Sequence, residues 1–353
     1  MGRTSKIPKV TSDKEIRLNS FIKCLAAIAP LIVFSSAAIG QPVVLKFASF
    51  ESPQAPFTAK VFAAWAEDVT KDSNGALKVE MFTGGTLGRN PLQQFKLVQD
   101  GIADLVWMVP GYTPGRFDDT EIVELPAIVN NSLEGSMVLT RMAARNELVG
   151  FADLKLVFLG NVPPVNIHGK FPIRTLADLK GKRMRVGSSV GAKMAESLGA
   201  VPVIIGAPAT TEAIAKGVVD GTFAEWIFIR AFKIEEVVSS HLVLPLGGTA
   251  VMVPMLKSRY DSLPPAARAV IDRHSGEAFV KRFAAVADIA QTEIPAEVAQ
   301  RGKNTVITAD AATRAAFATA TKPVADEWRQ AKPRNERVYQ TFTAELARVR
   351  AGK

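Results

Sequence analysis

Residues 176–199 read LADLKGKRMRVGSSVGAKMAESLG, which predicts a short helical turn, then a strand, then a new helix. In RMRV, two apolar residues alternate with two arginines, a pattern typical of a strand with one apolar face and one cationic face. Ser188 and Ser189 then supply good N-cap residues for the next helix. We therefore predict that Arg185 lies near the carboxyl end of a strand and beside a helix N-terminus.

This position makes Arg185 a candidate for binding an anion. Open α/β sheets bind ligands in the crevice at the carboxyl ends of their strands. The positive end of a helix dipole and a planar guanidinium both favour a carboxylate there. The alternative is a surface arginine beside Lys180, Lys182 and Arg183, and this stretch by itself leaves both interpretations open.

The N-terminus predicts a secretory signal peptide. Residues 1–23 carry six lysines or arginines, and an apolar run follows from Cys24 to Ile39 and ends in small residues. Cleavage after Ala38 or Gly40 fits this pattern. The alternative is an uncleaved membrane anchor, although the run is shorter than the roughly 20 residues that a membrane span prefers.

The predicted mature chain has a composition that favours an exported globular protein of two domains. Its length exceeds that of a typical single core, and the one cysteine of the sequence lies inside the signal. Removal of residues 1–40 lowers the formal net charge from +9 to +5, because they contain six basic and two acidic residues. Such an excess suits anionic ligands, and without basic-aromatic clusters we expect no nucleic-acid partner.

Strands and helices alternate along the mature chain, which predicts an α/β fold. The expected strands are 43–50, 77–82, 104–109, 155–160, 183–186 and 201–205, with an extended stretch at 242–256 that returns the chain to the first domain. The expected helices are 57–75, 90–101, 132–150, 190–198, 211–217, a long one at 264–300 and a last one at 335–353.

The segment GSSVG (187–191) also fits the nucleophile elbow of α/β hydrolases. Ser189 would be the nucleophile, and Asp220 and either His241 or His274 follow in the expected order. The pattern places His274 in the middle of a helix, however, which is a poor place for a triad base. A hydrolase stays open as an alternative, and the histidine spacing predicts no metal site.

Several short segments follow one another in a fixed order along the chain: GGTLG (84–88), QDGIADL (99–105), VWMVPGYTPGRF (106–117), ELPAI (124–128), PIRTLADLKGKRMRV (172–186), EAIAKGVVDG (212–221) and VPMLKSRYDSLPPAARAVID (253–272). In this order they make the chain resemble the solute-binding subunits of TRAP (tripartite ATP-independent periplasmic) transporters, the dicarboxylate-binding-protein family. The resemblance covers residues 43–345.

The resemblance implies a two-lobed binding protein, with a mixed sheet flanked by helices in each lobe and a long helix linking the lobes. It assigns 41–163 and about 251–290 to lobe 1, and 164–250 and about 291–353 to lobe 2.

The resemblance further implies that a small organic acid binds between the lobes and that Arg185 pairs with its carboxylate. The ligand-contacting residues expected beside Arg185 are Tyr112, Asn166, His168, Phe223, Glu225 and Trp226. Some relatives carry a second arginine before LADLKG, where this chain has NVPPVNIHGK, with Asn166 and His168 as the polar candidates instead. One arginine suggests a monocarboxylate, or a ligand whose far end is neutral or aromatic.

The expected partners are the organic acid and the membrane subunits of a TRAP transporter. We expect a periplasmic monomer without cofactor, metal or catalytic activity. The binding protein of an ATP-driven importer stays open as a further alternative, because it shares the two-lobed design.

Overall fold

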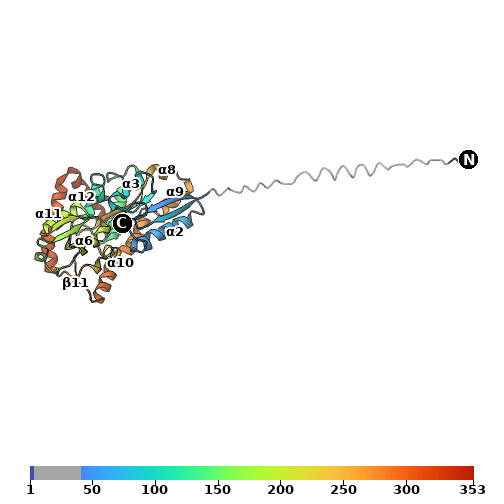
Figure 1. The fold of residues 1–353 in the computed structure, drawn as a ribbon. Coiled ribbons are helices and arrows are strands. Elements are labelled where there is room, and N and C mark those ends of the chain that lie inside the picture. The colour runs from blue at the N-terminus through green and yellow to red at the C-terminus, as the bar shows by residue number, and fades with distance from the viewer. Residues whose placement is uncertain (4–40) are drawn as a thin grey trace. The chain divides into compact units, whose positions relative to one another are not determined.

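The structure, a computed structural model, describes residues 1–3 and 41–353 (Figure 1). The predicted signal peptide falls almost entirely outside the described residues, so its cleavage stays a prediction. Among the described residues, no helix is both long enough and apolar enough to cross a membrane.

The unit Gly40–Lys353 contains two sheet systems. The first is the parallel sheet β2-β1-β3, in which β1 pairs with β2 along its whole length. A bridge between Met108 and Met252 joins it to the antiparallel pair β10-β4, so this system is mixed. The strands are β1 (Val43–Ala48), β2 (Leu77–Phe82), β3 (Leu105–Val106), β4 (Leu154–Val162) and β10 (Thr249–Leu256).

The second system is a six-stranded mixed sheet of order β11-β9-β5-β8-β6-β7. Strand β6 lies between β8 and β7 and is parallel to both, whereas β5 is antiparallel to its neighbours β8 and β9. The strands are β5 (Asn166–Gly169), β6 (Arg183–Val186), β7 (Val201–Ile204), β8 (Gly221–Ala224), β9 (Ser240–Val243) and β11 (Thr305–Thr308).

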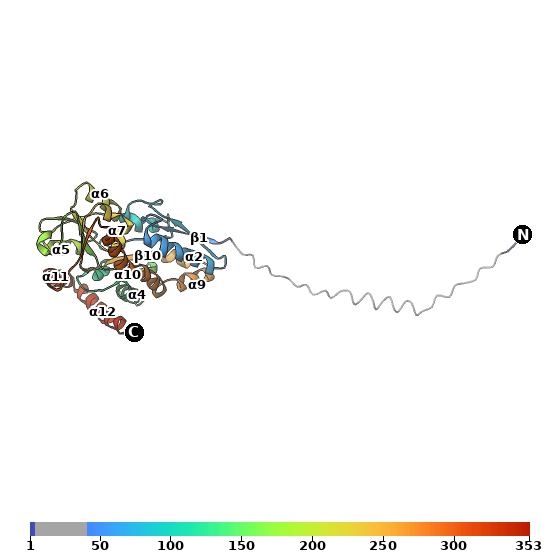
Figure 2. The same ribbon diagram turned by 90° about the horizontal axis from the view of Figure 1, so that it is seen from below.

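Helices surround both systems, and Figures 1 and 2 place α2 and α9 at one end of this unit and α11 at the other. The helices of the first half are η1 (Thr58–Phe62), α2 (Ala63–Asp72), η2 (Pro91–Gln93), α3 (Gln94–Gln99), η3 (Pro110–Tyr112), η4 (Asp118–Glu124) and α4 (Ser132–Ala144). Those that follow up to β9 are η5 (Leu176–Leu179), α5 (Ser189–Ser197), η6 (Ala207–Ala209), α6 (Thr210–Ala215), α7 (Trp226–Ala231) and η7 (Ile234–Glu236).

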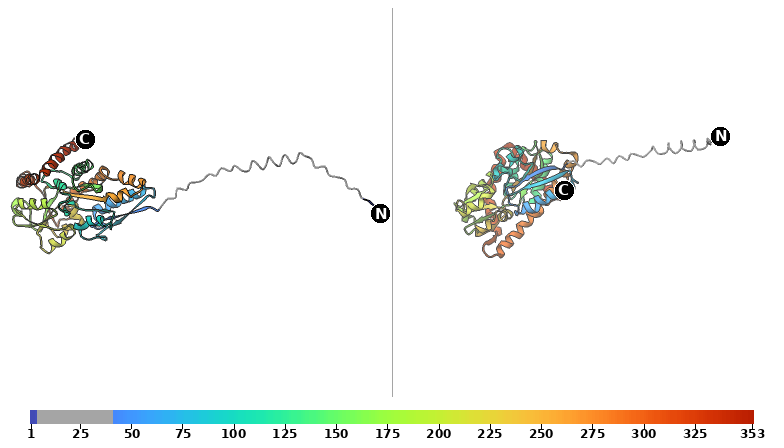
Figure 3. Two further views of the ribbon diagram at one scale, coloured as in Figure 1. Left: turned by 90° about the horizontal axis from the view of Figure 1, so that it is seen from above. Right: turned by 45° about the vertical axis from the view of Figure 1, so that its right-hand side comes forward.

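The last third of the chain is mostly helical. It contains α8 (Lys257–Asp261), α9 (Pro265–Arg273), α10 (Glu277–Gln300), α11 (Ala311–Ala331) and α12 (Pro333–Arg350). Helix α11 packs on α5 beside the second sheet, whereas α12, red in Figure 3, packs on α4 beside the first. The C-terminal helices therefore divide between the two sheet systems.

Helix α10 connects the two systems. It packs on α4 and β4 of the first and on α7 and β11 of the second. Its Gln291 accepts a hydrogen bond from the backbone N–H of Trp226 at 2.9 Å and donates one to the carbonyl of Pro164 at 2.9 Å. The predicted long linking helix is thus present and binds the segment through which β4 leads into β5.

The structure changes several predicted elements. The helix expected at 264–300 is interrupted at His274–Gly276, because Gly276 adopts a positive φ of 61°. The helix expected at 132–150 ends at Ala144, and Asn146 has a φ of 56°. Strands β5 and β11 and helix α11 were not predicted. Each of the two strands has four residues and acquires its regularity from its neighbours in the sheet.

At Gly247, the connection from β9 to β10 lies close to the backbone at the end of η4. A Cβ atom at Gly247 would lie 1.9 Å from the carbonyl oxygen of Glu124, and the N–H of Gly248 donates to the carbonyl of Val123 at 2.8 Å. No side chain fits at Gly247 without a backbone shift.

We therefore expect Gly247→Ala to lower the free energy of unfolding by about 1–3 kcal/mol, a typical cost of overpacking. The matched control is Gly111→Ala, whose Cβ would meet its nearest atoms, in Ser188 and Glu124, at 3.8 and 3.9 Å. Urea denaturation of both variants measures the difference. If the two variants unfold with equal free energies, the connection at Gly247 can shift to accommodate a side chain, and the prediction is wrong.

Candidate ligand site

Arg185 is the cation around which the site is built. Strand β6 ends one residue after it, and Ser188 caps α5 by accepting a hydrogen bond from the N–H of Gly191 at 3.0 Å. The predicted strand end and helix N-terminus are therefore both present. Arg185 is only 5% exposed, whereas Arg183 on the same strand is exposed and pairs with Asp220 at 2.9 Å.

The guanidinium of Arg185 is held by three neutral contacts. Its Nε donates to the carbonyl of Ile205 at 2.9 Å, and its Nη2 lies 3.4 Å from the hydroxyl of Tyr112. Its Cζ lies 4.8 Å from the ring centroid of Phe228, in the geometry of a cation–π contact. Within residues 41–353 it forms no ion pair. A buried cation in this state favours an anionic partner.

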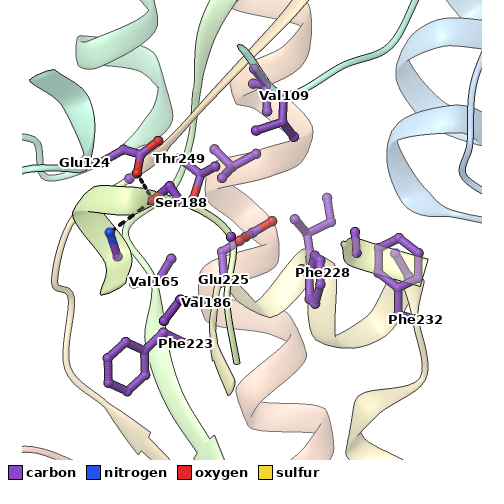
Figure 4. Close-up of a pocket in the computed structure, with 18 of the residues that line it drawn as sticks. Val109, Glu124, Val165, Val186, Ser188, Phe223, Glu225, Phe228, Phe232 and Thr249 are labelled. Carbon is purple, nitrogen blue, oxygen red and sulfur yellow. Dashed lines mark hydrogen bonds between the residues drawn. The ribbon is translucent and has the colours of Figure 1, made fainter. Parts of the chain in front are cut away.

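A cavity opens beside Arg185 between the two sheet systems, and Figure 4 shows part of its wall. Most of its lining is apolar, and its aromatic members are Phe50, Phe57, Trp107, Tyr112, Phe223, Phe228 and Phe232. Ionisable side chains from both systems also line it: Arg185, Glu51, Glu124 and Glu225. Apolar walls with a few convergent polar groups are typical of small-molecule sites.

Burial raises the pKa of all three glutamates in the lining. The pKa of Glu51 rises to about 7, chiefly by desolvation, and the nearby charge of Glu225 adds to the rise. Desolvation raises the pKa of Glu225 to about 7, against the opposing charge of Arg185. The pKa of Glu124 rises to about 8 by desolvation, against the hydrogen bond from Ser188. The cavity therefore carries less negative charge near neutral pH than three glutamates suggest.

Two serines at the start of α5 bind acidic side chains of η4. The hydroxyl of Ser188 donates to Glu124, as Figure 4 shows, and the hydroxyl of Ser189 donates to Glu121 at 2.8 Å. The indole of Trp328 on α11 donates to the other oxygen of Glu121 at 3.0 Å. These bonds join the second sheet's helices to a segment packed on the first system.

The hydrolase constellation is not assembled. Asp220 pairs with Arg183, and His241 lies against His168 with their Nδ1 atoms 2.7 Å apart. His274 ends α9 rather than lying mid-helix, and its Nε2 contacts Asp72 at 2.8 Å. Ser189 has Glu121 as its side-chain partner, so GSSVG acts here as a strand-to-helix turn.

Four of the seven predicted ligand-contacting residues line the cavity: Arg185, Tyr112, Phe223 and Glu225. Phe223 lies in β8, and Glu225 follows the end of that strand in an extended conformation, so the two residues project to the same side. In Figure 4 the carboxyl of Glu225 points into the cavity beside Phe228.

The other three, Asn166, His168 and Trp226, are buried away from the lining. Asn166 accepts a hydrogen bond from the N–H of Leu244 at 3.0 Å, which ties β5 to the end of β9. His168 contacts the carbonyl of Ala224 at 3.1 Å and packs edge-on against Trp226. Asn166 and His168 therefore have hydrogen-bond partners within the protein, whereas the indole N–H of Trp226 has none among the described residues. The contact of these three residues with a ligand stays a prediction.

Two buried carboxyls of the lining were missed by the sequence analysis. Glu51 comes soon after β1, so the rule that singled out Arg185, a polar residue after a strand end, could have found it. Glu124 lies at the end of the short helix η4, and its sequence surroundings carry no comparable signal. It is brought to the cavity by tertiary packing.

Comparison with known proteins supports the family resemblance. The sequence model of the bacterial extracellular solute-binding proteins of family 7, labelled DctP, matches residues 47–331. The C4-dicarboxylate-binding periplasmic protein DctP of Rhodobacter capsulatus is 26% identical over 264 residues, which span 72% of this chain and 77% of that protein.

Two solved structures are similar over almost their whole length. A marine metagenome TRAP solute-binding protein specific for aromatic acid ligands, from an unidentified microbe and crystallised with 3-hydroxybenzoate, is 31% identical with a TM-score of 0.82. It covers 87% of this chain and 99% of its own. A TRAP solute-binding protein of Rhodoferax ferrireducens with copurified benzoate is 29% identical, with a TM-score of 0.82 and coverage of 87% and 98%.

These relatives are two-lobed TRAP solute-binding proteins, and they support neither the hydrolase nor the ATP-driven importer. The fold, the extent of the family match and the position of Arg185 all agree with the family that the sequence resembles. The chain belongs to the bacterial extracellular solute-binding protein family 7, the DctP family of TRAP transporter solute-binding proteins.

Proposed function

We propose that this protein captures an aromatic monocarboxylate between its two lobes and delivers it to the membrane subunits of a TRAP transporter. The observation that carries the proposal is Arg185, a buried cation without an ionic partner among the described residues, in a cavity lined by aromatic side chains. The guanidinium would bind the carboxylate in a bidentate pair.

The aromatic lining favours a ring as the remainder of the ligand. Phe228 already packs on the guanidinium, and Trp107 lies 5.7 Å from Phe57 between ring centroids, so flat apolar surfaces extend from the cation. A ring would gain stacking and edge contacts with them. The aromatic acids bound by the two solved relatives are consistent with this choice.

A dicarboxylate is a poorer fit. Among the described residues that line the cavity, Arg185 is the sole cation, while three acidic side chains share the same space. A second ligand carboxylate would lie near Glu51, Glu124 or Glu225 without a positive partner, which costs free energy in an apolar cavity.

The remaining assignments belong to the same proposal. The signal peptide, residues 1–40, directs the chain to the periplasm and is removed there. Lobe 1 comprises 41–163 and about 251–290, and lobe 2 comprises 164–250 and about 291–353. The protein works as a monomer. It works without catalysis, since its partners are a ligand and a transporter rather than a reacting substrate.

Replacement of Arg185, the anchor of the ligand carboxylate in this proposal, tests it. Arg185→Ala should weaken binding of benzoate by about 2–5 kcal/mol, since the ligand carboxylate would be buried without its partner. The matched control is Arg183→Ala on the same strand, whose exposed side chain pairs with Asp220 and is not part of the cavity lining.

Isothermal titration calorimetry of the purified mature chain measures both affinities, and circular dichroism checks that each variant folds. The control should bind benzoate as the unmodified protein does. Unchanged affinity in Arg185→Ala would remove the anchor from the proposal, and the absence of benzoate binding in the unmodified chain would remove the ligand class.

The raised pKa values of the lining glutamates predict that binding depends on pH. Near pH 6 these carboxyls are largely protonated, and as the pH rises through about 7 to 8 they become negative beside the bound anion. The affinity for benzoate, which stays ionised throughout, should fall as the pH rises, by about tenfold or more by pH 9.

Glu225→Gln supplies the control, because an amide keeps the size of the side chain and cannot ionise. The dependence of affinity on pH should be shallower in this variant. A constant affinity in the unmodified protein across the range would show that the carboxyls do not sense the ligand's charge.

A further inference from the structure

Glu51 is a buried acidic side chain that is fixed in one orientation. The indole Nε1 of Trp107 donates to its Oε1 at 3.0 Å, and the hydroxyl of Thr58 lies 3.4 Å from its Oε2. Trp107 is itself packed among aromatic rings, with Phe62 at 4.8 Å and Phe283 at 5.9 Å between centroids. The carboxyl is therefore preorganised rather than free to turn away from the cavity.

These two contacts leave hydrogen-bonding capacity on the Glu51 carboxyl. A carboxylate offers about four lone-pair sites, and a protonated carboxyl adds one O–H donor. Glu51 lines the cavity, so its remaining capacity is available to a ligand. An apolar group placed against it would leave that capacity unsatisfied in a buried site, which costs free energy.

Glu51 and Arg185 come from different sheet systems and face the cavity from separate elements. Arg185 is held on the side of the second sheet by the carbonyl of Ile205, whereas Glu51 is held by Trp107, which follows β3 of the first system. Both side chains line the same cavity. A ligand whose carboxylate pairs with Arg185 would therefore extend from the second system toward the first, where Glu51 lies.

We propose that Glu51 determines specificity by hydrogen-bonding a hydroxyl group on the ring of an aromatic monocarboxylate whose carboxylate pairs with Arg185. This inference rests on the proposed function and adds the substituent that the site selects. A hydroxyl suits Glu51 because it donates to an ionised carboxyl and accepts from a protonated one. A ligand with an ammonium group would bind well only if the glutamates were ionised. A ligand with a second carboxylate would require further protons on the glutamates or on the ligand itself.

The other two glutamates of the cavity are less suited to this role. Glu124 is engaged by Ser188 and by the backbone of Ala250. The charge of Arg185 acts on Glu225, so the ionisation of Glu225 should affect the carboxylate bound there and hence every benzoate alike. Glu51 should affect only those ligands that carry a hydroxyl.

The experiment compares benzoate, 3-hydroxybenzoate and 4-hydroxybenzoate by calorimetry on the unmodified chain and on Glu51→Met, Glu51→Gln and Glu225→Gln. The measured quantity is the ratio of the benzoate Kd to the lower hydroxybenzoate Kd. General damage to the cavity affects both ligands and cancels in this ratio, whereas loss of a contact to the hydroxyl does not.

We expect the unmodified chain to prefer a hydroxybenzoate by about tenfold, the effect of one buried hydrogen bond. Glu51→Met should reduce the ratio to about one, Glu51→Gln should retain most of it because an amide still donates and accepts, and Glu225→Gln should leave it unchanged. If Glu51→Met does not fold, Glu51→Ala gives the same comparison. The smaller side chain leaves room for a water molecule to accept the hydrogen bond that the Trp107 indole donates to Glu51.

Each other result overturns the inference in a distinct way. A ratio near one in the unmodified chain, or a ratio that persists in Glu51→Met, removes Glu51 from specificity while the proposed function stands. A ratio lost in Glu225→Gln instead assigns the hydroxyl to Glu225. If none of the three benzoates binds the unmodified chain, the proposed function fails together with the inference.

Discussion

The burial of one guanidinium that forms no ion pair with any described residue is the constraint on which the rest of the site depends. Arg185 is removed from water, and its direct contacts are the Ile205 carbonyl, the Tyr112 hydroxyl and the face of Phe228. These neutral contacts hold the side chain in place without neutralising it. Desolvation of the guanidinium costs free energy, and an anion that enters the cavity would offset this cost.

The glutamates of the lining are consistent with this design rather than in conflict with it. Desolvation raises the pKa of Glu51, Glu124 and Glu225, so protons reduce the negative charge that would otherwise repel an anion. The same burial lets a protonated carboxyl act as a hydrogen-bond donor. In the function that we propose, one physical effect therefore favours the binding of the ligand carboxylate and lets Glu51 recognise a polar substituent.

The sequence analysis located part of this site because its signals are local. Alternation in RMRV and the serines after it place Arg185 at a strand end. Phe223 and Glu225 were predicted from the family resemblance, which implies that the residues after the VVDG segment line the pocket. Asn166, His168 and Trp226 lie outside the cavity lining, because a polar or aromatic residue near a pocket segment gives no sign of how the fold will bury it. Here Asn166 binds the backbone of Leu244, and His168 binds that of Ala224 and packs against Trp226.

The sequence by itself determined the α/β class, the family, most of the strands and the anchoring cation, because strand periodicity, helix caps and motif order are encoded within a few residues of one another. The tertiary structure alone decided which acidic and aromatic side chains line the cavity together with Arg185. Glu51, Trp107 and Glu124 are far from Arg185 in the chain, and they meet it only because the two sheet systems face the same cavity. Their burial, and with it the pKa of each glutamate, depends on neighbours that no local pattern specifies.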